Sequence, residues 1–347
     1  GTNESSPTGI MMTEYSRTPI PYLLIIALGL LILPACDDEA GQSAGTTDQT
    51  DGSVPTECGL CGDTCPAQSD WPTGFTCLPA GEYTMGSPEN ALPRDDDETE
   101  HTVALSRPFF MAANEVTQAE WEAVFENNPS WHNATHGRCE VDPCEDRPVE
   151  RVNWYEAIAY ANARSGLEGL TACYETQGCS GTPGSPCADD TNECLGGYIC
   201  QTVEPLTHCT GYRLPTESEW EYAVRAEGTR QVYGVVDDVA WYFANARLRT
   251  HPVGLMQDND WGLFDMLGNV HEWVWDRYAR DYGLLGDFNR TTVDPTGGEF
   301  EMTRVTRGGS WQSGYELCRA ANRENEFAGR RSNQIGFRLV RNFPPAP

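Results

Sequence analysis

The sequence predicts a mixed α+β domain that has little regular secondary structure and is rich in disulfides. Three short segments carry the same helix-capping pattern, and the strand-like stretches are brief. The 347 residues include 14 cysteines, most of them in clusters of even number. This length is compatible with two domains, or with one large domain that follows an N-terminal extension.

The charge excludes several classes of function. The net charge is −29 at pH 7, so phosphate backbones would repel the chain and we expect no nucleic-acid partner. All 23 basic residues are arginine. The absence of lysine excludes Schiff-base chemistry and a Walker-type phosphate loop.

Residues 1–36 are predicted to be a signal peptide with a lipobox. Pro19 to Ala35 is apolar and has the length of a secretory core, and Leu33-Pro34-Ala35-Cys36 resembles a bacterial lipoprotein box. Asp37 resembles the signal that retains lipoproteins in the inner membrane. A plain transmembrane anchor is the alternative. Either anchor places the remaining chain outside the cytoplasm, and we expect the periplasmic side of a bacterial envelope.

Residues 37–57 are acidic, small and almost free of apolar side chains, which predicts a disordered tether. A small cysteine-rich segment follows at 58–77. Its Cys58-Gly-Leu-Cys61 could be a redox or zinc pair, but no thioredoxin-like βαβ pattern or matching histidine surrounds it. We therefore favour a local disulfide knot.

From residue 78 the pattern is globular. The residues 81–86 and 102–106 alternate like strands on either side of an acidic loop at 95–100. Three helices are then predicted, because a capping residue stands three positions before a glutamate at 117–120, 153–156 and 216–219. Each helix begins with a tryptophan that we expect in the core, namely Trp121, Trp154 and Trp220. Glu219 is interpreted as a cap and Glu221 as part of a solvated face, although Glu221 could accept an arginine.

The stretch 173–209 is too long for a structureless loop and contains six cysteines. We predict a surface insertion whose cysteines pair among themselves, in one of about 15 connectivities. Near the C-terminus, 304–311 and 336–341 alternate like strands. Gly308 and Gly309 permit a bulge or a close backbone approach.

The most unusual stretch is Trp261–Asp276, WGLFDMLGNVHEWVWD. Its tryptophan and phenylalanine residues follow no sustained helical or strand period, so we predict irregular backbone. Asp265 and Glu272 flank the turn-forming Gly268 and Asn269, which suits an all-oxygen Ca²⁺ site. The simpler interpretation is a tight loop fixed by buried tryptophans with solvated acids.

Several motifs, taken in order, resemble the formylglycine-generating enzymes, also called sulfatase-modifying factors. They are GEYTMGS, EVTQAEWEAV, RPVERVNWYEAIAYAN, YRLPTESEWEYAVRAE, WGLFDMLGNVHEWVWD, RVTRGGSW, RAANR and IGFRLVR. The resemblance covers residues 78–342 and implies a single α+β domain of the C-type-lectin-like formylglycine-generating-enzyme fold. We expect a monomer.

The resemblance implies a calcium site formed by the Asp265 side chain, the Gly268 and Val270 carbonyls and Glu272. A second family site would begin at Asn245 and Ala246, but its later ligands fall in a segment that is shortened here to 247–252. We therefore expect one calcium ion rather than two.

Copper chemistry is not expected. The family enzyme holds copper with two cysteines after the Gly-Gly-Ser strand, where soft thiolates suit Cu(I). Here Ser313 occupies the first position, and the second falls within a shortened segment. Ser310 and Cys318 also line this region by the resemblance. Cys318 is expected to be a buried free thiol or one half of a disulfide.

Three functions remain open. The first is an envelope lipoprotein of the family, stabilised by calcium, that binds a protein or small molecule or assists protein maturation. The second is an oxidoreductase of the family with a non-haem metal, acting on a protein or a siderophore. The third is a lectin-like recognition module that presents the polar run 318–333. His132 and His136 match part of an iron-binding pattern, but Arg138 stands where a glutamate is needed, so we interpret the match as accidental.

Overall fold

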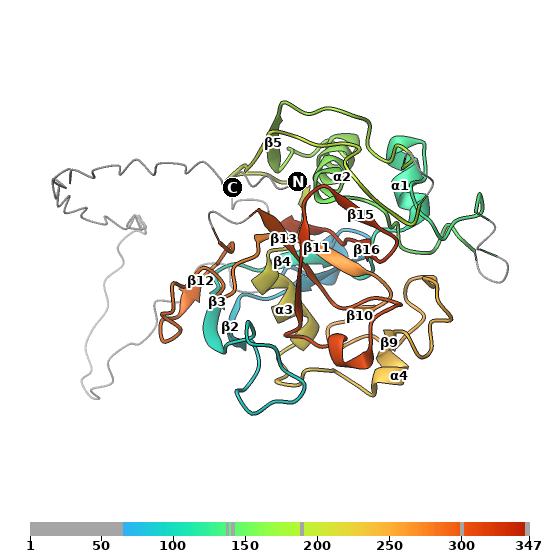
Figure 1. The fold of residues 1–347 in the computed structure, drawn as a ribbon. Coiled ribbons are helices and arrows are strands. Elements are labelled where there is room, and N and C mark those ends of the chain that lie inside the picture. Colours follow the sequence, from blue (N-terminus) through green and yellow to red (C-terminus); the bar gives the residue numbers. More distant parts are fainter. Residues whose placement is uncertain (1–64, 137–138, 140–142, 188–190, 299–301, 344–347) are drawn as a thin grey trace, which may run out of the picture. The chain divides into compact units, whose positions relative to one another are not determined.

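A computed structural model describes residues 65–343 except 137–138, 140–142, 188–190 and 299–301 (Figure 1). The predicted signal peptide, lipobox and tether lie outside this part of the chain, as do Cys58 and Cys61. No helix within the described part is long and apolar enough to cross a membrane. The proposals for residues 1–61 therefore stay predictions.

Helices are few and short in the described part of the chain. They are α1 (Gln118–Phe125), α2 (Trp154–Leu167), α3 (Glu217–Arg225) and α4 (Val236–Val239), with 3-10 turns at Gln68–Asp70 and Tyr315–Leu317. The strands are β1 (Phe75–Leu78), β2 (Gly81–Met85), β3 (His101–Leu105), β4 (Phe109–Ala112), β5 (Tyr174–Gln177), β6 (Glu193–Leu195), β7 (Thr202–Pro205), β8 (Tyr212–Arg213), β9 (Ala240–Trp241), β10 (Leu267–Gly268), β11 (His271–Arg277), β12 (Thr292–Val293), β13 (Thr303–Arg307), β14 (Arg323–Phe327), β15 (Arg330–Ser332), β16 (Ile335–Gly336) and β17 (Val340–Asn342). The predicted class, α+β with little regular secondary structure and many disulfides, is confirmed.

The three predicted helices form where their caps indicated. Thr117, Asn153 and Thr216 each accept a hydrogen bond from the backbone N–H three residues on, and the glutamate there returns a bond to the cap. The first-turn residues Trp121, Trp154 and Trp220 are completely buried. Local sequence therefore decided where these helices begin.

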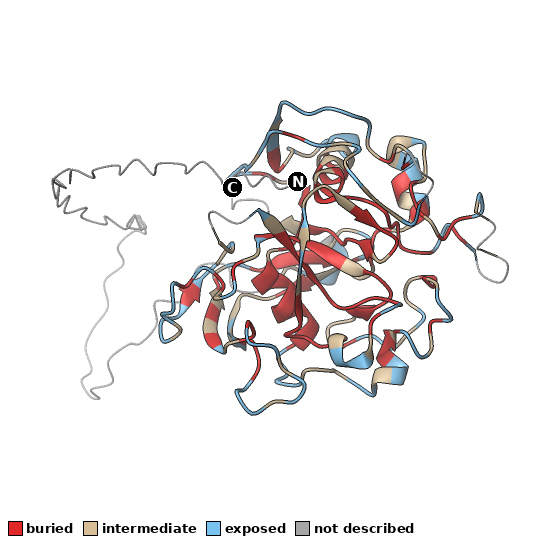
Figure 2. Cartoon of the chain, in the orientation of Figure 1, coloured by how far each residue is buried: buried red, intermediate tan, exposed pale blue. Residues whose placement is uncertain are grey.

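The centre of the domain is a sheet in the order β14-β13-β11-β16 (Figure 1). Strand β11 lies between two neighbours, and nearly all of its side chains are buried or half-buried (Figure 2). The prediction of irregular backbone over Trp261–Asp276 is therefore wrong for its second half. A strand that is covered on both faces shows no alternation of apolar and polar residues, so the period search could not detect it.

A second sheet has the strand order β1-β4-β17-β8. The chain passes from the central sheet into it between β16 and β17. Strand β1 crosses the boundary that we predicted at residue 78, because Phe75 and Cys77 pair with β4 and belong to the core. The predicted strand 336–341 is divided in two. Strand β16 pairs with β11, and β17 pairs with β4 and β8, so the chain leaves one sheet and joins the other between Phe337 and Leu339.

The strand prediction near the N-terminus of the domain is confirmed. Strands β2 and β3 form an antiparallel pair from Gly81↔Leu105 to Met85↔His101. The acidic loop before β3 is only partly solvated, since Glu98 is fully buried.

The cysteine-rich insertion is stapled by three nested disulfides, Cys173–Cys209, Cys179–Cys200 and Cys187–Cys194. The prediction that its six cysteines pair among themselves is confirmed. Further bridges join Cys65 to Cys77 and Cys139 to Cys144. Within the insertion β5 pairs with β7, and β6 pairs with β15 of the domain, which attaches the insertion to it.

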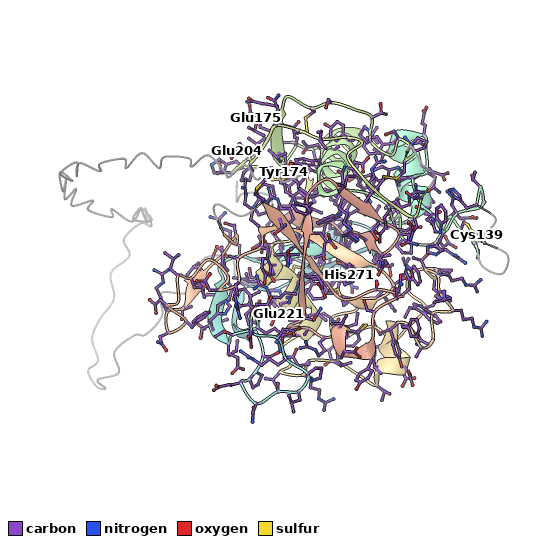
Figure 3. The ribbon with its side chains drawn as sticks, viewed as in Figure 1. Cys139, Tyr174, Glu175, Glu204, Glu221 and His271 are labelled. Carbon is purple, nitrogen blue, oxygen red and sulfur yellow. A yellow bond between two sulfur atoms is a disulfide. The ribbon has the colours of Figure 1, made fainter. Side chains whose placement is uncertain are left out.

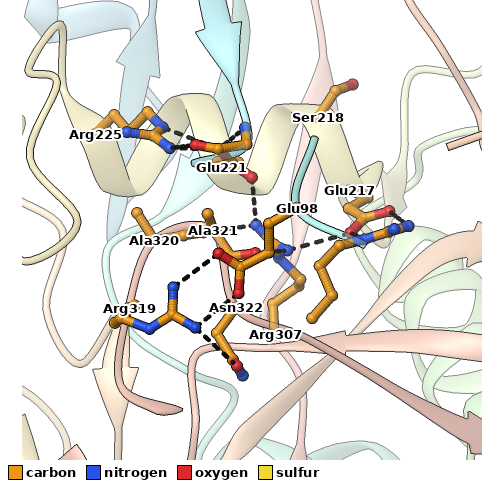
Figure 4. Close-up of polar contacts among 12 residues, drawn as sticks. Glu98, Glu217, Ser218, Glu221, Arg225, Arg307, Arg319, Ala320, Ala321 and Asn322 are labelled. Carbon is orange, nitrogen blue, oxygen red and sulfur yellow. Dashed lines mark hydrogen bonds and ion pairs between the residues drawn. The ribbon is translucent and has the colours of Figure 1, made fainter. Parts of the chain in front are cut away.

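A buried ionic network joins α3 to the central sheet (Figure 4). Arg307 donates to Glu221 at 2.6 Å and to Glu217 at 3.2 Å, and Arg225 pairs with Glu221 at 2.7 Å. Glu221 is fully buried, so its interpretation as part of a solvated face is wrong, and the alternative of an arginine partner is confirmed. A buried carboxylate is tolerated here because guanidinium groups compensate its charge.

Candidate functional site

The turn that follows β13 carries the residues that the resemblance assigns to an active-site region, Ser310 and Ser313. Gly308 and Gly309 have φ of +95° and +78°. A Cβ at Gly308 would lie 3.0 Å from the Met266 carbonyl oxygen, and one at Gly309 would lie 2.9 Å from Sγ of Cys318. Both glycines are therefore required for a close backbone approach, as the sequence indicated.

Ser310 and Ser313 face each other beside a histidine. Their hydroxyl oxygens are 3.2 Å apart, and the Ser310 backbone N–H donates to Oγ of Ser313 at 3.0 Å. Nε2 of His271 lies 3.4 Å from Oγ of Ser313. The Ser310 hydroxyl also contacts Oε1 of Gln334 at 3.2 Å. Ser310 is fully buried and Ser313 nearly so, and only His271 and Gln334 of this hydrogen-bonded group are partly exposed.

Burial lowers the pKa of His271 to about 4, so the imidazole is neutral near pH 7. Its Nδ1 is buried and has no hydrogen-bond partner among the described residues. His271 is the first residue of β11 and is half-buried (Figure 3). A weakly basic imidazole with no orienting carboxylate suits a polar lining rather than a general base.

Cys318 lies behind this turn as a fully buried free thiol. Burial, assisted by the Glu316 carboxylate, raises the pKa of its thiol to about 12. The thiol is therefore protonated at neutral pH, whereas a metal ligand must be a thiolate. Of the two alternatives for Cys318, the buried free thiol is confirmed and the disulfide is wrong.

The four residues predicted to bind calcium lie in the turn before β11 and at its start. Asp265 is buried; its Oδ2 accepts the Gly254 N–H at 2.7 Å, and its Oδ1 has no hydrogen-bond partner among the described residues. Glu272 is also buried, but both its oxygens are engaged. Arg338 donates to them at 2.7 Å each, and the Trp220 indole donates at 2.8 Å.

The fit to calcium is therefore partial. Asp265 has an unused oxygen suited to a hard cation, and Gly268 and Val270 lie in the same turn. Glu272 does not fit as it stands, because the Arg338 guanidinium already neutralises it. No group of three or more His, Cys, Asp or Glu in the described ranges is arranged to hold a metal. The alternative of solvated acids is wrong, since both carboxylates are buried.

Sequence reasoning missed two residues of this cluster, Glu115 and Arg338. Glu115 accepts the Val270 N–H at 3.2 Å and the Asn269 amide at 2.7 Å, so it holds the turn from the opposite side. Burial and the nearby Asp265 and Glu272 raise the pKa of Glu115 well above its usual value. Burial raises the pKa of Asp265 to about 6. The motif EVTQ contains Glu115, but nothing in its spacing connects it with residue 270.

The histidines at 132 and 136 do not form a site together. Residues 131–136 are bends and turns, as the loop interpretation requires. His132 contacts Glu150 at 3.4 Å, whereas His136 contacts Asn133 at 2.9 Å.

An exposed apolar rim lies next to Ser313. The Phe243 N–H donates to the Ser313 carbonyl at 2.9 Å, which places Phe243 beside the site, and Tyr315 follows two residues later. Phe243 is 58% exposed and Tyr315 is 61% exposed. Large exposed aromatic side chains next to a group of polar side chains are typical of a binding surface.

The Gly-Gly-Ser turn, the capped helices and the β11 turn together define a domain of the sulfatase-modifying-factor type. Residues 64–343 match the family described as the Sulfatase-modifying factor enzyme 1-like domain, and the chain belongs to this family. The predicted recognition of the formylglycine-generating-enzyme family is confirmed.

Two curated relatives illustrate the range of the family. The Chaperone protein LppX of Paenibacillus barcinonensis is 32% identical over 265 residues, which cover 70% of this chain and 83% of the relative. The Formylglycine-generating enzyme of Thermomonospora curvata is 26% identical over 306 residues, covering 77% and 93%.

Two solved structures share the fold. Treponema denticola variable protein 1 superposes with a TM-score of 0.63 at 30% identity, covering 78% of this chain and 95% of that one. PvdO from Pseudomonas aeruginosa gives a TM-score of 0.55 at 23% identity, with coverage of 78% and 94%, which shows a common fold alone. The predicted fold is confirmed.

Proposed function

We propose that this chain is a member of the family that does not use copper and that assists protein maturation by binding an extended polypeptide at the exposed surface of Phe243 and Tyr315, next to the buried Ser310 and Ser313. The observation that carries the proposal is the Ser313 hydroxyl, bonded to Ser310 and beside neutral His271, where the resemblance would place a copper thiolate. The partly exposed imidazole of His271 and amide of Gln334 can hydrogen-bond a peptide backbone. They do not replace two soft thiolates.

The rim supports this proposal. Phe243 is hydrogen-bonded through its backbone to Ser313, Tyr315 follows two residues later, and both exposed rings could cover apolar side chains of a bound peptide. A relative that shares 32% identity bears the name of a chaperone, which favours a role in maturation for this chain as well.

The lectin-like alternative is less well supported. Within the polar run 318–333, residues 318–323 and 331–333 are buried, so only 324–330 could be presented to a ligand. Arg319 and Arg323 in this run are committed to the ion pairs with Glu98 and Glu217.

Binding can be measured by fluorescence anisotropy with a permanently unfolded polypeptide, fluorescently labelled, whose cysteines have been carboxymethylated. The variant Phe243→Ser/Tyr315→Ser should weaken binding at least about tenfold, since hot-spot aromatics typically contribute 2 kcal/mol or more. Leu285→Ser is the matched control, because Leu285 is 94% exposed and is neither on the rim nor on the Gly-Gly-Ser turn. Equal affinity in all three proteins, or no binding by the unsubstituted chain, would contradict the proposal.

The absence of formylglycine formation is a separate prediction. Purified protein incubated with Cu(I), oxygen and a Cys-x-Pro-x-Arg peptide should leave the cysteine unmodified, as judged by mass spectrometry. Cys318 is too deeply buried and too weakly acidic to bind copper without local unfolding. An aldehyde product would show that the protein is an oxidase after all.

We further propose that the protein binds calcium at the turn containing Asp265 and that a lipid on Cys36 anchors it in the envelope. The buried oxygen of Asp265 supports the first proposal. The lipobox and acidic segment of the sequence support the second.

A further inference from the structure

The disulfide-stapled insertion is attached to the domain at strand β15. Strand β6 pairs with β15 in the register Arg330↔Leu195, Arg331↔Cys194 and Ser332↔Glu193. The Glu193 carboxylate accepts the Ser332 hydroxyl at 3.2 Å and pairs with Arg330 at 3.0 Å. Half of this small sheet therefore belongs to the insertion, and half belongs to the domain.

The Cys187–Cys194 bridge closes around Arg331. Cys194 lies opposite Arg331 in the strand pair, and the Arg331 guanidinium donates to the carbonyl of Ser185, two residues before Cys187. The same guanidinium pairs with Glu156 of α2, and both groups are buried. The bridge thus joins β6 to the segment at Ser185 and Cys187 that contacts this arginine.

The contacts continue from β15 into the site. The Asn333 N–H donates to the Asn192 carbonyl at 3.0 Å, and the Asn333 carbonyl accepts the Trp311 indole N–H at 2.9 Å. The next residue, Gln334, accepts the Ser310 hydroxyl with its side chain and the His271 N–H with its carbonyl, at 3.2 and 2.7 Å.

We propose that the insertion is the positioning element of the binding surface, with Asn192 and Glu193 as positioning residues. In this proposal the Cys187–Cys194 bridge keeps β6 paired with β15. Gln334, which contacts both Ser310 and His271, is only two positions beyond the end of β15. When the bridge is broken, the pairing of β6 with β15 becomes easier to open, and the segment 332–334 loses the contacts that fix Gln334 against Ser310. Ligand binding then depends on the oxidised state of one disulfide; this last part rests on the proposed function.

Hydrogen exchange tests the positioning without any ligand. In the variant Cys187→Ser/Cys194→Ser, the backbone amides of Asn333 and His271 should exchange about tenfold faster or more, because local opening controls their rate. The matched control is Cys179→Ser/Cys200→Ser, which removes another bridge of the same insertion that does not lie in the β6–β15 pair. Unchanged exchange in the first variant, or the same acceleration in both, would overturn the proposal.

A second pair of variants keeps every bridge. Ser332→Ala removes the hydroxyl that contacts Glu193 and receives the Gln334 N–H, so it should accelerate exchange at Gln334. Glu204→Ala on β7 (Figure 3), a strand that pairs with β5 and not with β15, should not. No acceleration in Ser332→Ala would also count against the proposal, even if the cysteine variant failed to fold.

Anisotropy with the carboxymethylated polypeptide then separates the two proposals. Weaker binding by Cys187→Ser/Cys194→Ser, with the control unchanged, supports the insertion as a positioning element. Faster exchange with undiminished binding would overturn the link between insertion and surface. If the unsubstituted chain does not bind the probe, the proposed function is lost, while the exchange data still decide whether the insertion fixes Gln334.

Discussion

Arginine provides all the basic side chains of this protein, and the fold uses them in its interior. Arg307, Arg323, Arg331 and Arg338 are buried, and each pairs with a buried glutamate. A planar guanidinium can bind a carboxylate with two parallel hydrogen bonds while donating to backbone carbonyls, which a lysine ammonium cannot reproduce. Figure 4 shows this arrangement around α3. Substitution of one partner should therefore lower the free energy of unfolding by more than the loss of a surface ion pair does.

Glu98 provides a test of this argument. Its oxygens accept Arg319 at 2.6 and 2.8 Å and the Ser87 hydroxyl at 2.6 Å. Glu98→Gln leaves the buried Arg319 charge poorly compensated, and should lower the free energy of unfolding by about 3 kcal/mol. Glu82→Gln, at an exposed position of β2, is the control and should change stability by less than about 0.5 kcal/mol. Urea denaturation measures both, and equal stability would contradict the argument.

The same carboxyl group predicts a pH dependence. Burial alone would raise the pKa of Glu98, but hydrogen bonds from Arg319 and Ser87 outweigh it, and the pKa lies below its ordinary value. The group therefore stabilises the fold above the ordinary glutamate pKa, and the contribution is lost as the pH falls through the lower, folded-state pKa. Unfolding measured between pH 7 and pH 3 should show a shallower acid dependence in Glu98→Gln. Parallel profiles would show that Glu98 does not contribute.

Calcium binding is best tested at Asp265. Glu272→Ala would leave Arg338 buried without its partner, so it should destabilise the protein whether or not calcium binds. Asp265 has an oxygen without a hydrogen-bond partner, so Asp265→Asn removes the charge with little change of shape. EDTA should lower the melting temperature of the unsubstituted protein and should not change that of Asp265→Asn. At a hundredfold excess of calcium over Kd, bound calcium would add about 2.7 kcal/mol to the free energy of unfolding. An identical EDTA response in both proteins would show that calcium does not bind at this turn.

At the scale of elements, the turn after β13 makes a steric prediction. Gly309 and Gly74 both have φ of +78°, but a Cβ at Gly309 would lie 2.9 Å from Sγ of Cys318, while one at Gly74 would meet nothing within 4 Å. Alanine is strained by the backbone conformation at both positions. Gly309→Ala should be less stable than Gly74→Ala by about 1–3 kcal/mol, the usual cost of overpacking a core. Thermal unfolding of the two variants measures the difference, and equal melting temperatures would refute the steric argument.

The elements that the sequence predicted are those with local signals. A capping box lies within four residues, so Thr117, Asn153 and Thr216 could be identified without knowing the fold. Strand β11 has no such signal, because its burial is decided by β13 and β16, which come much later in the chain. The division of 336–341 into β16 and β17 likewise depends on two sheets that no local pattern describes.

At the scale of the whole molecule, the candidate site could be predicted only in part. Ser310, Ser313 and Cys318 were found because they follow a recognisable motif. His271, Gln334, Glu115 and Arg338 were not identified as members of these clusters, since each reaches its cluster from a distant segment through burial and hydrogen bonds. The nested disulfides were equally hidden, because six cysteines allow about 15 connectivities and only the folded chain selects one.

The last prediction concerns the division between residues 1–57 and the folded domain. The core residues and disulfides described above all lie within residues 65–343. A protein that starts at Cys58 should therefore melt within about 2 °C of the processed full-length protein, since a loss of 1 kcal/mol would shift a domain of this size by roughly 2–4 °C. The same truncation, and Cys36→Ala in the full chain, should move the protein from the membrane fraction to the soluble fraction, because both remove the proposed acylation site. Mass spectrometry of Cys36 is the direct readout. A lower melting temperature in the truncated protein would show that residues 1–57 contribute to the fold. Membrane association that survives Cys36→Ala, without an acyl mass, would favour the plain transmembrane anchor instead.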